Sequence, residues 1–211
     1  EPIPAGRRIC EELGLNLVAE EIAKAGGVDV TTQVLDMKRK KTEYCIFHGF
    51  VTSPITTVMQ QAKDYGLDCQ FMGTFWSTEK HLLDQLGPMA DEYMGVTAYS
   101  FYYQDEYPMI QKIREWNKKH HPANAEYRPQ AYMQNFMAGL LMIRALENAD
   151  KLGGFTPENI VKGFQSIKNY DVGGLTPPVT IENNSIPMGR VVRGNSKTGQ
   201  FDPVSDWIRL K

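Results

Sequence analysis

Two short apolar runs, each ending in glycine and each followed by a helical pattern, constrain the fold of this chain most strongly. The first run covers residues 44–49 (YCIFHG) and the second covers residues 69–73 (CQFMG). Helical patterns follow at 53–65, with Pro54 in the first turn, and at 77–86, and a glycine closes each of them. This order of strand, helix, strand and helix is typical of a parallel sheet with right-handed crossovers.

The flanking segments extend the same pattern and then change it. Before the repeat, the sequence predicts a helix end at 5–13, a strand at 16–22 and a helix at 30–40 with Val34, Leu35 and Met37 inward. After it we expect a strand at 94–101, helices at 107–119, 128–151 and 156–167, and strands at 179–181, 190–193 and 201–210. Strands that follow a helical block cannot extend the sheet by simple succession, so we expect them to return to an earlier layer.

Composition narrows the class of protein. With 211 residues and 42% hydrophobic residues, the chain has enough apolar material for one large domain or two small ones. The 23 basic and 25 acidic residues give a formal net charge of -2, which supplies no basic field for a nucleic-acid partner. No stretch reaches the roughly 18 uninterrupted apolar residues of a spanning helix. The sequence starts at Glu1 without an apolar leader, so we expect any targeting segment to have been removed or left out.

The sequence contains none of the common catalytic motifs. It contains no nucleophile elbow, no phosphate-binding loop and no HExxH pattern. Cys10, Cys45 and Cys69 match no zinc or redox spacing, and we expect them to be buried small hydrophobic residues. A disulfide between Cys45 and Cys69 stays open as an alternative, because neighbouring parallel strands would place them side by side. We therefore expect neither an enzyme nor a metal or cofactor site.

A ligand site is expected at the carboxyl ends of the two central strands, where open parallel sheets bind ligands. These ends combine glycines for close backbone approach, hydroxyls for directional bonds and aromatic cover. The candidate contacts are His48, Gly49, Phe50, Thr52, Thr74, Phe75, Trp76 and, from the next aromatic cluster, Tyr102. Two alternatives stay open: the aromatic residues are core or interface residues, and His48 is a structural residue bonded to a neighbouring carbonyl. The pair His120 and His121 is expected to end a helix.

The order of elements, together with several short motifs, resembles the type I periplasmic binding proteins. The motifs lie at 28–35 (VDVTTQVL), 44–49, 61–67 (QAKDYGL), 71–73 (FMG) and 206–208 (DWI). Specifically, the chain looks like the branched-chain amino acid (leucine/isoleucine/valine-binding) branch that serves ABC importers. The resemblance implies an α/β fold: two Rossmann-like lobes with open parallel sheets and flanking helices, joined by three crossovers. It also implies that hinge closure traps a small ligand between the lobes.

The same resemblance implies how the lobes divide the chain. Residues 1–101 would form the second lobe, residues 102–171 the helical part of the first lobe, and residues 172–211 strands that return to the second lobe. The sheet of the first lobe would then come mostly from residues upstream of those present. We therefore expect a C-terminal fragment that dimerises or pairs with its missing N-terminal part.

The function implied by the resemblance is that of an extracytoplasmic solute-binding component of an ABC importer, periplasmic or lipid-anchored outside the cytoplasmic membrane. Its partners would be a small-molecule solute and the membrane permease, with no nucleic acid and no cofactor. The alternative is the ligand-sensing domain of a receptor or transcription regulator with the same fold.

The class of solute is narrowed by one departure from the family pattern. Family members that bind amino acids hold the α-ammonium with an acidic residue shortly after the strand matched by 71–73. This chain has Thr74, Phe75 and Trp76 there and no acid before Glu79. An ammonium would lack its charge partner, so the sequence favours an aromatic or aliphatic carboxylate or an amide over an ordinary amino acid.

Overall fold

Two compact units make up the computed structural model, which describes residues 2–24, 26–49 and 53–209. Unit 1 consists of residues 1–96 and 192–204, and unit 2 consists of residues 97–191 and 205–211. The chain therefore passes between the units three times, after residues 96, 191 and 204. The expected boundaries, after 101 and after 171, differ from these passages.

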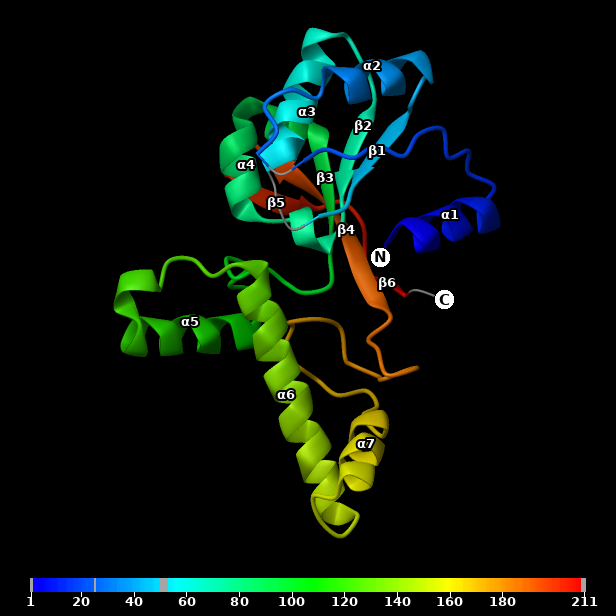
Figure 1. The fold of residues 1–211 in the computed structure, drawn as a ribbon. Helices are drawn as coiled ribbons and strands as arrows, with labels where there is room; N and C mark the ends of the chain where they lie inside the picture. Colours follow the sequence, from blue (N-terminus) through cyan, green and yellow to red (C-terminus); the bar gives the residue numbers. More distant parts are fainter. Residues whose placement is uncertain (1, 25, 50–52, 210–211) are drawn as a thin grey trace. The chain divides into compact units, whose positions relative to one another are not determined.

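An open sheet organises unit 1 in the strand order β1-β2-β3-β4-β5 (Figure 1). Its strands are β1 Tyr44–Phe47, β2 Gln70–Gly73, β3 Tyr93–Thr97, β4 Met188–Asn195 and β5 Gln200–Pro203. The pairs β1–β2 and β2–β3 are parallel, as the repeat of strand and helix predicted. The pair β4–β5 is an antiparallel hairpin, which brings the end of the chain back to this sheet. The predicted parallel-dominated α/β fold is confirmed.

The helices of unit 1 follow the predicted spans closely. They are α1 Pro2–Glu12, α2 Thr31–Arg39, α3 Ser53–Asp64 and α4 Lys80–Leu86, with the 3-10 turns η1 Phe75–Ser77 and η2 Gly87–Glu92. Helix α4 begins three residues later than predicted, because η1 occupies the segment directly after β2. The rings of Phe71, Tyr93 and Phe201 are buried in this unit, and Tyr93 lies 6.4 Å from Phe201 between centroids. These aromatic rings belong to the core that supports the strand ends.

The strand predicted at 16–22 is wrong. The described chain forms no ladder there, and Leu17 and Ile22 are 45% and 76% exposed. An alternating apolar pattern becomes a strand only where a neighbouring strand completes its hydrogen bonds, and none of the described strands pairs with this segment. The inward placement of Leu35 is also wrong: Val34 and Met37 are buried on one side of α2, whereas Leu35 is exposed.

Unit 2 is a helical layer with its own core. It contains α5 Pro108–His120, η3 Pro122–Asn124, α6 Gln130–Lys151, α7 Pro157–Gln165 and the short strand β6 Ile208–Arg209. The core members share nearly complete burial; they include Ile110, Ile113, Met133, Met137, Leu141, Ile167, Val172, Leu175, Val179 and Ile181. No helix of the described residues has the length and apolar character that crossing a membrane requires.

The segment 172–211, expected to return to the second lobe as strands, is divided between the two units in the structure. Val172, Leu175 and Val179 are buried in the core of unit 2, which holds the chain there until residue 191. Residues 192–204 do return to the sheet of unit 1 as most of the β4–β5 hairpin. The chain then rejoins unit 2, where β6 pairs with Met188 and Gly189 of β4. The predicted strand at 179–181 is a single bridge between Val179 and Tyr170.

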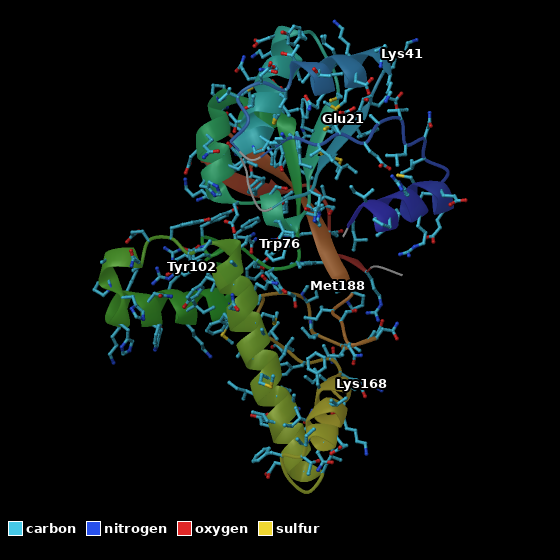
Figure 2. The ribbon with its side chains drawn as sticks, viewed as in Figure 1. Glu21, Lys41, Trp76, Tyr102, Lys168 and Met188 are labelled. Atoms are coloured by element: carbon cyan, nitrogen blue, oxygen red, sulfur yellow. The ribbon has the colours of Figure 1, made fainter. Side chains whose placement is uncertain are left out.

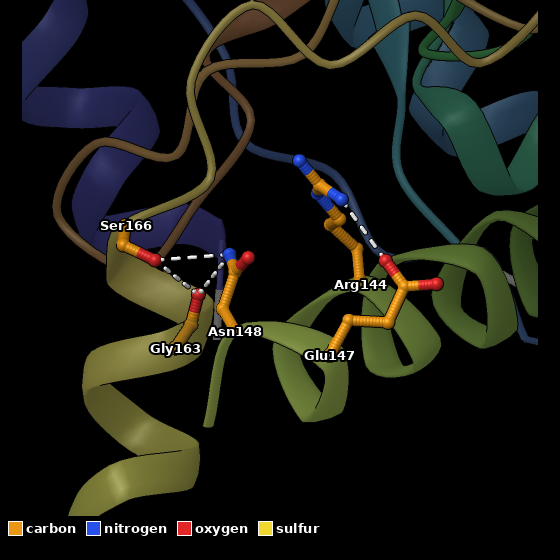
Figure 3. A network of polar contacts seen from close by, with 5 residues as sticks. All are labelled: Arg144, Glu147, Asn148, Gly163 and Ser166. Atoms are coloured by element: carbon orange, nitrogen blue, oxygen red, sulfur yellow. Dashed lines mark hydrogen bonds and ion pairs between the residues drawn. The ribbon is translucent and has the colours of Figure 1, made fainter. Parts of the chain in front are cut away.

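Close packing of α7 on α6 depends on a glycine. A Cβ at Gly163 would lie 2.3 Å from the carbonyl oxygen of Ala145, so the helices approach too closely for any side chain. Figure 3 shows the polar contacts beside this approach: Asn148 Nδ2 donates to the Gly163 carbonyl at 3.1 Å and to Ser166 Oγ at 3.0 Å. The Ser166 hydroxyl also donates to the Gly163 carbonyl at 2.8 Å.

We predict that Gly163→Ala lowers the free energy of unfolding by about 1–3 kcal/mol, because the added methyl forces the two helices apart. The matched control is Gly139→Ala in α6, where a Cβ meets nothing within 4 Å. That change should raise the free energy of unfolding by about 0.5–1 kcal/mol through helix propensity. Urea denaturation followed by circular dichroism measures both, and equal effects of the two substitutions would contradict the packing argument.

Candidate functional site

The carboxyl ends of β1 and β2 lie side by side, as the sequence predicted. Phe47 is in register with Gly73, and the Thr74 amide donates to the Phe47 carbonyl at 3.0 Å. One residue beyond β1, the Nδ1 atom of His48 lies 3.3 Å from Thr74 Oγ1. The partner that the structure gives the imidazole is this hydroxyl, rather than the carbonyl of the structural alternative.

The turn after β2 is held by hydroxyl groups that point inward. The Thr74 carbonyl accepts hydrogen bonds from the Ser77 amide at 3.0 Å, from Ser77 Oγ at 3.2 Å and from Thr78 Oγ1 at 3.0 Å. Ser77 and Thr78 are fully buried. Because these bonds fix η1, they also fix the aromatic pair that η1 carries.

Phe75 and Trp76 form that aromatic pair. Their rings meet edge to face, with centroids 5.4 Å apart and planes at 73°. Trp76, labelled in Figure 2, is 39% exposed, and Phe75 is half-buried. The arrangement presents apolar surface next to the imidazole and hydroxyl of the strand ends. It can cover an apolar body while His48 and Thr74 offer hydrogen bonds.

Gly73 has a different role from the one expected. A Cβ there would lie 1.8 Å from the Tyr93 hydroxyl and 2.6 Å from Ser77 Oγ, so the missing side chain makes room for Tyr93 rather than for a ligand. The Tyr93 hydroxyl donates to the Ser77 carbonyl at 3.0 Å, and burial raises the pKa of Tyr93 to about 12. Tyr93 is a supporting residue that the sequence patterns did not predict. In the sequence Tyr93 directly precedes the strand predicted at 94–101, and the structure places it in register with Phe71 of β2.

The remaining candidates separate into three groups. Gly49 follows His48, and a Cβ added to it would meet no atom within 4 Å, so the backbone is open at this end of the site. Phe50 and Thr52 lie outside the described residues. Tyr102 belongs to unit 2, where it is 1% exposed and donates its hydroxyl to the Ala125 carbonyl at 2.8 Å. Tyr102 is thus a core residue of unit 2, and its contact with a ligand stays a prediction.

The cysteines are unpaired in the structure. Cys45 is in register with Phe71, so Cys69 lies two residues away along the neighbouring strand, which explains why no disulfide forms. Burial, followed by the nearby Cys69 thiol, raises the pKa of Cys45 to about 12. Burial and the adjacent Asp68 carboxylate raise the pKa of Cys69 to about 11. Both thiols stay protonated near neutral pH and are poor nucleophiles.

A cavity of about 650 Å³ in unit 1 is lined by Val28, α3 and the turn after α4, and its lining does not include the strand-end residues. Within the described ranges, no group of three histidine, cysteine or acidic side chains could hold a metal ion. The described strand-end groups are the imidazole of His48, the hydroxyl of Thr74 and the Phe75–Trp76 ring pair.

Comparison with known proteins agrees with this geometry. The model of the periplasmic binding protein family matches residues 1–196. No curated protein matches the sequence significantly.

Several solved structures share the fold. A branched-chain amino acid ABC transporter protein from Thermus thermophilus with bound valine has a TM-score of 0.82 at 19% identity, covering 99% of this chain and 56% of that one. A leucine-binding protein from Thermotoga maritima gives 0.72 at 18% identity, with 94% and 53% covered. A fatty acid ABC transporter substrate-binding protein from Thermomonospora curvata gives 0.71 at 18% identity, with 99% and 54% covered. The chain therefore spans a little over half the length of these structures.

The raised thiol pKa values predict a pH dependence of stability. A cysteine thiol in the unfolded chain has a pKa of about 8.5, whereas Cys45 in the folded protein keeps its proton up to a pH of about 12. Since the unfolded state binds fewer protons above that pH, the free energy of unfolding should fall as the pH rises from about 8.5 to 10. We expect a shallower fall for Cys45→Ala, measured by urea denaturation over the same pH range. Parallel slopes for Cys45→Ala and the unmodified protein would contradict this prediction.

Proposed function

Because this chain belongs to the periplasmic binding protein family, we propose that it forms part of an extracytoplasmic solute-binding component of an ABC importer. The observation that carries the proposal is the adjacency of His48, Thr74 and the Phe75–Trp76 pair at two neighbouring strand ends. The similar structures include a protein with bound valine, a leucine-binding protein and a fatty acid ABC transporter protein. Binding of a small solute, delivered to a membrane permease without chemical change, fits all of these observations.

The chemistry of the strand ends favours a solute without an ammonium group. Between Gly73 and Glu79 the chain has no carboxylate to pair with an ammonium. The Trp76 ring could contribute only about 0.5–2 kcal/mol by cation–π contact, less than a lost ion pair in a desolvated site costs. In contrast, the imidazole of His48 and the hydroxyl of Thr74 can bond a carboxylate or an amide. We propose an aromatic or aliphatic carboxylate, or an amide, as the solute.

In this proposal unit 1 supplies one wall of the site. Phe75 and Trp76 cover the apolar body of the solute, and Thr74 and His48 direct its polar group. The remaining contacts come from other residues of the complete protein. The 211-residue chain alone should therefore bind the solute far more weakly than the complete protein, a difference that calorimetry would measure.

The solute class is tested by a thermal-shift screen of the complete protein against amino acids, aromatic and aliphatic carboxylates, and small amides. A ligand that binds only the folded state raises the melting temperature by linkage. We expect a rise with carboxylates or amides. A rise with ordinary amino acids alone would overturn the proposed class, and no rise with any compound would count against solute binding.

The proposed wall is tested by Trp76→Ala and Phe75→Ala in the complete protein. Each change removes aromatic contact area, and we expect the affinity for the solute found in the screen to fall about tenfold or more. The control is Trp116→Ala on α5, which truncates a tryptophan that is 51% exposed in unit 2. If calorimetry gives the same affinity for all three variants and the unmodified protein, the proposal that Phe75 and Trp76 contact the solute is wrong.

A further inference from the structure

Arg190 in β4 is a buried cation that has no acidic partner among the described residues. Its side chain is 5% exposed, and the described ion pairs of the chain do not include it. Its Nε atom is buried and has no hydrogen-bond partner in the described part of the chain. Burial of a guanidinium without a carboxylate is unfavourable by itself. The contacts that Arg190 does make therefore indicate its structural role.

Two other segments of unit 2 supply those contacts. Arg190 Nη2 donates to Gln104 Oε1 at 2.9 Å, and the same oxygen accepts from the Phe101 amide at 2.7 Å. The guanidinium also lies over the ring of Trp207, 4.8 Å from its centroid. A planar guanidinium can donate in its plane and stack on an aromatic face at the same time, which lysine cannot do.

The three connected segments are those in which the chain passes between the units. Gln104 follows the passage after residue 96, Arg190 directly precedes the passage after residue 191, and Trp207 follows the passage after residue 204. A hydrogen bond from backbone to side chain and a strand pairing also join the last two segments. The Val191 amide donates to Ser205 Oγ at 2.9 Å, and Met188 and Gly189 pair with β6. Each of these contacts lies inside unit 2.

We propose that Arg190 is a positioning residue that fixes all three connecting segments to unit 2. Each connecting segment is thereby held on the unit 2 side of its passage. The role in solute binding rests on the proposed function, because a rearrangement of the units is what a trapped solute would require. The attachment of the three segments does not rest on it.

The neighbouring Arg193 provides a matched control. It lies on the same strand but belongs to unit 1, is exposed, and donates to the Asp91 carbonyl at 3.2 Å. Truncation of the charged group at either position leaves a similar aliphatic chain. A difference between the two variants therefore reports the contacts to Gln104 and Trp207.

The test is hydrogen–deuterium exchange of the complete protein, without any solute, for Arg190→Met and Arg193→Met. In Arg190→Met we expect exchange to rise about tenfold in the three peptides 98–105, 186–191 and 205–209 together. The peptides of α6 and α7 and of the β1–β2 pair should keep their protection. Arg193→Met should leave all three connecting peptides unchanged.

Two further variants keep the proposal falsifiable if Arg190→Met does not fold. Gln104→Leu should raise hydrogen exchange in peptide 98–105. Gln104→Leu and Arg190→Lys each remove the hydrogen bond between Arg190 and Gln104, so the double variant should raise exchange by less than the sum of the two single variants. Arg190→Lys alone should retain most protection at 205–209 through the cation over Trp207. A rise confined to 186–191, or an equal rise throughout unit 2, would overturn the positioning role. Failure of the thermal-shift screen would count against the proposed function alone.

Discussion

The parallel pairing of β1 with β2 is the interaction on which the candidate site depends. Its register sets Phe47 beside Gly73, and the next residue of each strand is therefore His48 beside Thr74. A shift of one strand by one residue would turn the side chains of that strand to the opposite face of the sheet and separate His48 from Thr74. The rings of Phe47, Phe71 and Tyr93 pack together in this register. The packing of the core therefore also determines where the polar groups of the candidate site lie.

Much of this fold could be predicted from local sequence. The span of α2 follows from apolar periodicity, and those of α3 and the β1–β2 pair also follow from glycine or proline at their ends. The errors concern pairing between distant segments. Residues 16–22 have the pattern of a strand but no described partner, and residues 172–181 pack in the core of unit 2 before β4 joins the sheet. A pattern states which face is apolar, but not which element will cover it.

The candidate site was predictable only in its placement. The rule that ligands bind at strand ends selected His48, Thr74, Phe75 and Trp76, and the structure pairs His48 with Thr74 and Phe75 with Trp76 in unit 1, while their contact with a ligand stays a prediction. The pattern of the sequence did not indicate that Tyr102 is buried with its hydroxyl bonded to the Ala125 carbonyl. Supporting residues such as Tyr93 have no sequence motif, because their role depends on contacts with neighbouring strands.

The close approach of Tyr93 to Gly73 has a consequence for how such a binding surface can diversify. Any side chain at position 73 would displace the Tyr93 hydroxyl and with it the bond that holds the Ser77 carbonyl. The turn that carries Phe75 and Trp76 would move as well. Substitutions of the side chains at 74–76 leave the approach of Tyr93 to the Gly73 backbone in place, whereas a side chain at 73 removes it. In the proposed site, residue 73 would therefore determine the position of the turn, and residues 74–76 its chemistry.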